Sequence, residues 1–280
     1  MVRNIKLRRV LTRCFIYFML ILMYAPIILL FIFSFVDFDY IDFKQLLTFE
    51  NVNFNLYKEL FVGDDGETVI TAFKNTILIA LSSAFVSTIL GTLGAIGIFY
   101  SKRRMRGLYE LGGQIPILNP EIITALSLTI LFVFIGIRFN FITLLIGHVV
   151  LTVPFVVLSI TPKLKQMDPN TYEAALDLGA KPTKALFTII IPQIASGIIS
   201  GFVLAVTLSL DDYIITAFTR DNSFVTLSTY VYGVTSKRGA IPPTLRALST
   251  IIVVITLTVL IIVNVSTKKK NKGARRWKSI

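Results

Sequence analysis

Cysteine and histidine are almost absent from this chain, which carries one of each in 280 residues. The single Cys14 excludes a disulfide within the chain and a cysteine-rich metal site. The single His148 excludes a cluster of histidine ligands for a metal ion. The sequence also has no G-x-x-x-x-G-K-[ST] phosphate-binding loop, so we expect the chain to bind neither ATP nor another cofactor by itself.

Charged residues are scarce as well, at 16%, and they separate long apolar runs in a chain that is 54% hydrophobic. A bilayer core requires about 20 consecutive apolar residues in a helix, and every backbone polar group in lipid must bond within its own segment. We therefore expect an all-α, polytopic membrane protein in which residues 1–280 form one transmembrane domain of six helices. The expected spans cover residues 14–36, 69–99, 111–137, 141–160, 194–219 and 245–265.

The basic residues predict how these spans are oriented. The N-terminal segment, residues 101–110, residues 161–193 and the C-terminal tail together hold 20 Lys and Arg, whereas the opposite loops hold six. Because Lys and Arg concentrate in cytoplasmic loops, both termini are predicted to be cytoplasmic. The basic residues flank apolar runs, so they indicate contact with membrane lipid and not with nucleic acid. The first run has no small-residue cleavage site and is expected to stay as an anchor.

Small residues recur at four-residue spacing in two of the spans, which favours close packing of helix backbones in lipid. We expect these faces to serve packing. They comprise Ser83, Ser87, Gly91 and Ala95 in the second span, and Gly197, Gly201, Ala205 and Ser209 in the fifth.

The cytoplasmic segment between the fourth and fifth spans has helix signals of its own. Asp168 followed by Pro169 is typical of a helix start, and Gly179 is typical of a helix end. These residues predict a short helix over residues 169–178. Pro182 begins a second helical segment, and Pro192 is expected to end or kink it at the membrane.

In this segment Glu173-Ala174-Ala175 is followed at fixed spacing by Gly179 and then by Pro192. With this pattern the segment resembles the "EAA" loop of ABC importer permeases of type I. The resemblance is carried by fixed spacing over about 20 residues of the loop. It implies that the segment is a coupling helix docking into the ATPase subunit, and it implies three partners: a second permease subunit, a dimer of ATP-binding subunits that uses the ATP, and an extracytoplasmic substrate-binding protein. It also implies that the protein is located in the bacterial cell membrane. The matching residues are Glu173, Ala174, Ala175, Gly179 and Pro192, with Ile191 where the family usually has leucine.

Three carboxylates fall within or near the spans, namely Glu121, Asp211 and Asp212. A charged group at the centre of a membrane helix costs roughly 2.5–3.5 kcal/mol, so we expect these groups to face an aqueous path or a partner. A continuous helix places Asp212 on a polar stripe with Ser209 and Thr216. We therefore predict that Asp212 lines a cation route and that Asp211 has the more structural share. The competing interpretation is a helix break at Asn119-Pro120 and, for the two aspartates, a role in capping a broken helix or in pairing with the neighbouring permease.

Three segments around these carboxylates are residues 118–122, His148 with residues 151–157, and residues 207–213. They resemble the spermidine/putrescine permeases, those of the "C" type in particular. The resemblance runs from the first to the sixth span and implies transport of a small cation. It assigns Glu121, Ser209, Asp211 and Asp212 to the substrate path, and Thr216 joins them on the polar stripe. The family has a Trp-Tyr pair where this chain has Leu56-Tyr57. His148 is expected to be packed and hydrogen-bonded, not a proton relay.

Other functions remain open at this point. An ABC permease for thiamine, iron or a compatible solute would share the same loop. A proton-coupled secondary transporter would use the buried carboxylates as proton relays. An intramembrane enzyme would need a nucleophile and a base, for which one histidine and one cysteine in different spans are a poor basis.

Overall fold

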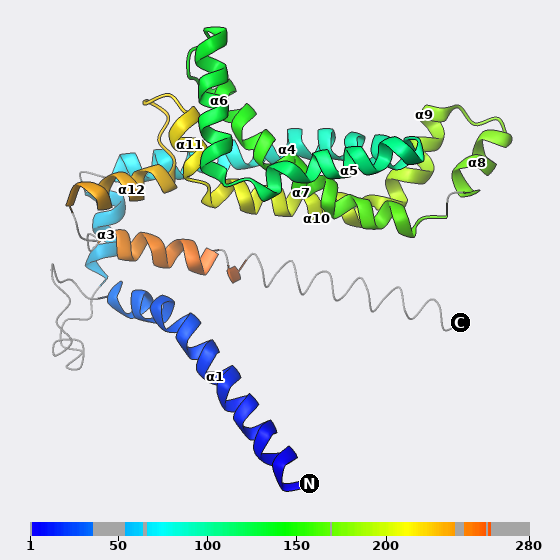
Figure 1. The fold of residues 1–280 in the computed structure, drawn as a ribbon. Helices are drawn as coiled ribbons and strands as arrows, with labels where there is room; N and C mark the ends of the chain where they lie inside the picture. The colour runs from blue at the N-terminus through cyan, green and yellow to red at the C-terminus, as the bar shows by residue number, and fades with distance from the viewer. Residues whose placement is uncertain are drawn as a thin grey trace. The chain divides into compact units, whose positions relative to one another are not determined.

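The structure is a computed structural model that describes residues 2–35, 54–63, 66–168, 170–238, 244–255 and 257–258. It forms two compact units, Met1–Val69 with Gly233–Ile280, and Ile70–Tyr232. The regular elements of the described residues are all helical (Figure 1). They are α1 (Val2–Phe33), α3 (Asn55–Val62), α4 (Gly66–Tyr100), α5 (Arg103–Leu118), α6 (Glu121–Ile135), α7 (Phe141–Gln166), α8 (Asn170–Asp177), α9 (Pro182–Ala185), the π-helical turn η1 (Leu186–Ile190), α10 (Ile191–Asp211), α11 (Ile214–Thr219) and α12 (Leu227–Arg238).

The first unit contains α1, α3 and an apolar helix, Thr244–Ile255. Helix α3 lies in a region that the sequence analysis treated only as an outer loop. Its signal was the four-residue spacing of Leu56 and Leu60, both of which are buried. Tyr57, the neighbour of Leu56, holds a hydrogen bond of 2.7 Å between its Oη and the Ser34 Oγ.

The second unit is built around α7, which packs along α10 and also contacts α5, α6 and α11 (Figure 1). Helix α7 begins at a capping box, because the Asn140 side chain accepts from the backbone of Thr143 while the Thr143 hydroxyl accepts from the Asn140 N–H. The two small-residue faces pack against this helix, as expected. A Cβ added at Gly91 or Gly201 would lie 2.7 or 3.1 Å from the Val156 side chain.

The expected membrane-spanning character is confirmed by the lengths and composition of the helices. Within the described residues, four helices are long and apolar enough to cross a membrane, and a fifth crossing results if α5 and α6 form one bent span. Thr244–Ile255 is a shorter apolar helix that matches the start of the sixth expected span. The end of that expected span, residues 259–265, lies outside the described residues.

Two expected spans are not continuous, and a local cause is present in each. The span expected at 111–137 bends by 100° between α5 and α6, where Asn119 and Pro120 are extended, because proline lacks an N–H and disfavours helix in the residue before it. The span expected at 194–219 ends at Asp211, because Asp212 is extended with ψ 128°. The preferred prediction from the sequence treated the second span as continuous helix, whereas its alternative included both the break at Asn119-Pro120 and a cap role for the aspartates at a broken helix.

Pro192 marks the entry to α10, although it does not end a helix there. It occupies the first turn of α10, directly after the π-helical turn η1. Proline is tolerated in a first turn because its missing N–H is not needed there. The π-helical turn before it interrupts the regular α-helical hydrogen bonding at the place where proline has no N–H to donate.

Candidate substrate path and coupling loop

The break between α10 and α11 is held by the carboxylate of Asp212. Its Oδ1 accepts from the Ile215 N–H at 3.1 Å, and its Oδ2 accepts from the Thr216 N–H at 2.8 Å. The Thr216 hydroxyl donates to the same Oδ2 at 2.8 Å. These bonds satisfy backbone donors at the start of α11 that have no partner within the helix. Asp212 is therefore a helix cap, buried inside the second unit.

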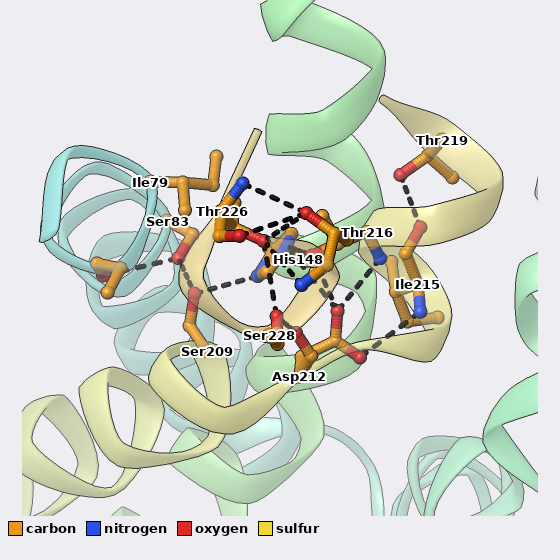
Figure 2. A network of polar contacts seen from close by, with 12 residues as sticks. Ile79, Ser83, His148, Ser209, Asp212, Ile215, Thr216, Thr219, Thr226 and Ser228 are labelled. Atoms are coloured by element: carbon orange, nitrogen blue, oxygen red, sulfur yellow. Dashed lines mark hydrogen bonds and ion pairs between the residues drawn. The ribbon is translucent and has the colours of Figure 1, made fainter. Parts of the chain in front are cut away.

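His148, on α7, lies at the centre of the polar groups around this break (Figure 2). Its Nδ1 lies 2.7 Å from the Ser209 Oγ of α10, and its Nε2 lies 2.9 Å from the Thr216 Oγ1 of α11. The Nε2 is also 3.6 Å from the Asp212 Oδ2. His148 has no exposed surface. It is packed and hydrogen-bonded, as the sequence analysis expected.

Further hydroxyl groups fix the segments that flank the break. The Ser83 hydroxyl of α4 donates to the Ser209 Oγ at 3.1 Å, and the Ser228 hydroxyl of α12 donates to the Asp212 carbonyl at 2.7 Å (Figure 2). At the far end of α11, the Thr143 hydroxyl donates to the Thr219 carbonyl at 2.9 Å. Side chains from several helices thus replace the hydrogen bonds that a broken helix gives up.

Asp211 and Glu121 stand in contrast to Asp212. Both are exposed in the chain, and neither forms a salt bridge with any described residue. Glu121 opens α6 directly after the Asn119-Pro120 break, and α6 contacts α11, the helix that Asp212 caps. The two breaks therefore bring the three carboxylates into one region of the second unit.

The two aspartates have the opposite exposure to the one that the preferred prediction implies. Asp212 was expected to line a route and Asp211 to be structural, but Asp212 is buried and bonded whereas Asp211 is exposed. The expectation assumed an unbroken helix with about 100° per residue. The extended backbone of Asp212 ends that periodicity. Ser209 and Thr216 do lie together with Asp212, yet they meet around His148 and are buried.

Two members of this network were not identified from the sequence as partners of the break. Ser83 was noticed only for its place on a small-residue face. Ser228 follows the short outer loop and carries no periodic signal. Hydroxyl side chains in an apolar span usually bond their own helix, as Thr207 and Ser200 do, so sequence alone gives no reason to single these two out.

The coupling loop has the predicted architecture. Helix α8 covers the described part of the helix expected at residues 169–178, and Pro169 lies outside the described residues. Gly179 follows it in the left-handed conformation, with φ 83°. Its N–H donates to the Leu176 carbonyl at 2.9 Å, and the Ala180 N–H donates to the Ala175 carbonyl at 3.0 Å. This pair of bonds is the Schellman motif that glycine favours.

Helix α8 leaves most of its surface uncovered. None of its residues is buried, and Glu173, Ala174 and Gly179 are exposed. Leu178 is 89% exposed, which is unusual for a leucine and leaves an apolar group for a partner. The opposite side of α8 is fixed by Tyr172, whose ring centroid lies 5.4 Å from that of Tyr100 at the end of α4. The loop is thus attached to the spans and free on its outer face.

The comparison with known families agrees with this arrangement. Residues 87–275 match the family described as the binding-protein-dependent transport system inner membrane component. The chain belongs to this family, whose members are the permease subunits of ABC importers. It is accordingly a transport subunit and a multi-pass membrane protein, which favours the ATP-driven interpretation over a proton-coupled transporter or an enzyme.

Two relatives show which members of the family this chain is similar to. The chain is 32% identical over 251 residues to the spermidine/putrescine transport system permease protein PotC of Haemophilus influenzae, covering 89% of this chain and 93% of that protein. It is 33% identical over 240 residues to the putrescine transport system permease protein PotI of Escherichia coli K12, covering 82% and 81%. The resemblance to spermidine/putrescine permeases of the "C" type is confirmed.

A solved structure supports the fold. A bacterial ABC transporter involved in the import of the acidic polysaccharide alginate contains a chain that matches with a TM-score of 0.70 at 16% identity, over 95% of this chain and 97% of that one. At this identity the match shows a shared fold. The fold is that of a type I ABC permease.

Proposed function

We propose that this chain is a permease subunit of an ATP-driven importer that moves polyamines, spermidine or putrescine, into the cytoplasm. The observation that carries this proposal is the pair of exposed carboxylates, Glu121 and Asp211, which no described basic residue neutralises. Polyamines are flexible cations at neutral pH, and a route lined with carboxylates favours cations. The polyamine names of the relatives support the same substrate class.

The partners follow from the family and from the coupling loop. The exposed outer face of α8, with Glu173 and the apolar Leu178, is proposed to dock into a separate ATP-binding subunit that supplies the hydrolysis. A second permease subunit and an extracytoplasmic substrate-binding protein are proposed to complete the importer. The chain itself is proposed to bind no cofactor. Its location is proposed to be the bacterial cell membrane.

Uptake measurements test the substrate class directly. Cells lacking this gene are expected to take up labelled spermidine or putrescine much more slowly than the parent, and the gene supplied in trans is expected to restore uptake. Depleting ATP is expected to stop it even when a proton gradient remains. Normal polyamine uptake without the gene, together with lost uptake of another solute such as thiamine, would contradict the polyamine proposal.

Reporter fusions test the proposed orientation. A cytoplasm-active reporter fused after Ile280 is expected to be active, because 20 Lys and Arg lie on the side predicted to be cytoplasmic. The same reporter inserted in the acidic loop at residues 37–68 is expected to be silent, and a periplasm-active reporter is expected to give the reverse pattern. The six-span prediction places these two sites on opposite sides of the membrane. Equal signals from both sites would therefore contradict it.

A further inference from the structure

The hydrogen bonds around His148 fix the direction of donation on the Nε2 side of its ring. The carboxylate of Asp212 can only accept, so the Thr216 hydroxyl donates its one proton to it at 2.8 Å. The Thr216 oxygen must therefore accept from His148, whose Nε2 lies 2.9 Å away. This requirement places a proton on Nε2 of the imidazole.

The other side of the ring completes the same chain. With its proton on Nε2, a neutral imidazole presents a lone pair at Nδ1, which accepts from the Ser209 hydroxyl at 2.7 Å. The Ser209 oxygen in turn accepts from Ser83 at 3.1 Å. The donors thus run from Ser83 through Ser209, His148 and Thr216 to Asp212.

We infer that His148 is a positioning residue, which locks the break between α10 and α11 so that Asp211, and not Asp212, faces the transported cation. The identity of the cation rests on the proposed function, whereas the role of His148 in the break does not. The imidazole joins a hydroxyl of α10 to one of α11 across the extended residue Asp212. Backbone hydrogen bonds within a helix cannot make this link, because α10 ends at Asp211.

The position of the break decides which carboxylate remains free. Asp212 uses both oxygens on Ile215 and Thr216 and is buried, so it has little capacity left for a solute. Asp211, one residue earlier and still in α10, is exposed. If the link through His148 is removed, buried polar atoms of Ser209 and Thr216 lose a partner, which is costly enough to favour rearrangement of the break.

Hydrogen exchange on the purified, assembled importer tests the lock without any solute. His148→Leu is expected to raise the exchange rate of the backbone amides in residues 212–219 by about tenfold, because their Asp212 cap is no longer held. His148→Gln is expected to leave most of the protection, since a planar amide also offers one acceptor and one donor. Unchanged exchange in His148→Leu would overturn the inference.

Two serines of α10 supply a matched control that avoids replacing a large buried ring. Ser209→Ala removes the hydroxyl that donates to His148 and is expected to raise exchange in residues 212–219. Ser200→Ala removes a hydroxyl that donates at 2.8 Å to the Ser196 carbonyl of its own helix, and it is expected to change nothing there. Equal exchange in the two variants would also overturn the inference.

Labelled spermidine supplies the transport readout. His148→Leu is expected to raise the apparent KM for uptake about tenfold, because Asp211 is no longer held toward the cation, and His148→Gln is expected to restore most of the affinity. Equal losses in the leucine and glutamine variants would mean that the hydrogen bonds are irrelevant. If the unaltered importer takes up no spermidine, the polyamine proposal fails, and the exchange experiment still decides the role of His148.

Discussion

Replacing Gly179 by valine is expected to reduce solute uptake roughly 5- to 30-fold while the membrane spans still insert. Gly179 ends α8 at φ 83°, a conformation that costs an ordinary L-residue about 1–2 kcal/mol and a β-branched one more. A Cβ at this position meets no atom within 4 Å, so the loss comes from the backbone alone. The strained turn should tilt α8 away from its docking geometry. Uptake and solute-stimulated ATP hydrolysis of the assembled importer are the measurements.

Two further variants separate docking from general strain. Gly179→Asn is expected to keep most of the uptake, because asparagine tolerates the left-handed conformation. Gly136→Val places the same strain at the end of α6, where φ is 78° and a Cβ also meets no atom within 4 Å. It is expected to leave association with the ATP-binding subunit intact. Full-rate uptake by Gly179→Val would remove the case for a coupling helix.

The coupling loop could be predicted from the sequence because its signals are local. A cap, a proline and a glycine each constrain the backbone within a few residues, so the expected helix over residues 169–178 and the left-handed Gly179 are close to what the structure has. The apolar runs likewise predicted the spans, since lipid imposes helices on them. Both predictions depend on neighbouring residues only.

The candidate site was less predictable because it depends on where a helix breaks. The sequence grouped Glu121, Asp211 and Asp212 as unusual, but the direction in which each carboxylate points was extrapolated along an unbroken helix. The break at Asp212 depends on His148, 64 residues earlier in the chain, and on Ser228, after the outer loop. Contacts of this kind are tertiary, and helical periodicity carries no information about them.

The same reasoning explains why α3 was missed. Its eight residues are too few to form a stable helix alone, so its formation depends on burying Leu56 and Leu60. The surrounding residues 37–68 hold no long apolar run, so the sequence predicted only a loop between the first two spans. Only the bond between Tyr57 and Ser34, together with that burial, reveals the segment as part of the packed first unit.

Neutralising the exposed carboxylates should lower the affinity of the importer for cations, whereas neutralising the buried one should affect the break. Asp211→Asn and Glu121→Gln are each expected to raise the apparent KM for spermidine about tenfold, which corresponds to roughly 1.4 kcal/mol for a charge interaction in a partly hydrated site. Combining them should raise it further. The maximal rate should change little, because neither side chain forms a salt bridge with a described residue.

Asp212→Asn should behave differently, although it removes the same charge. An asparagine places an NH₂ donor where the carboxylate accepts from the N–H groups of Ile215 and Thr216, so one of these donors would face another donor. The variant is expected to lose maximal rate and thermal stability more than affinity. Asp221→Asn, which removes an exposed charge whose carboxylate accepts from the Ser223 hydroxyl at 2.6 Å, is the control and should leave the KM unchanged. The measurement is the initial uptake rate against spermidine concentration at equal membrane expression. Equal KM values for the unaltered importer, Asp211→Asn and Glu121→Gln would remove the electrostatic argument for a cationic solute. A route that binds a multiply charged cation through these two carboxylates cannot lose either charge without a loss of affinity.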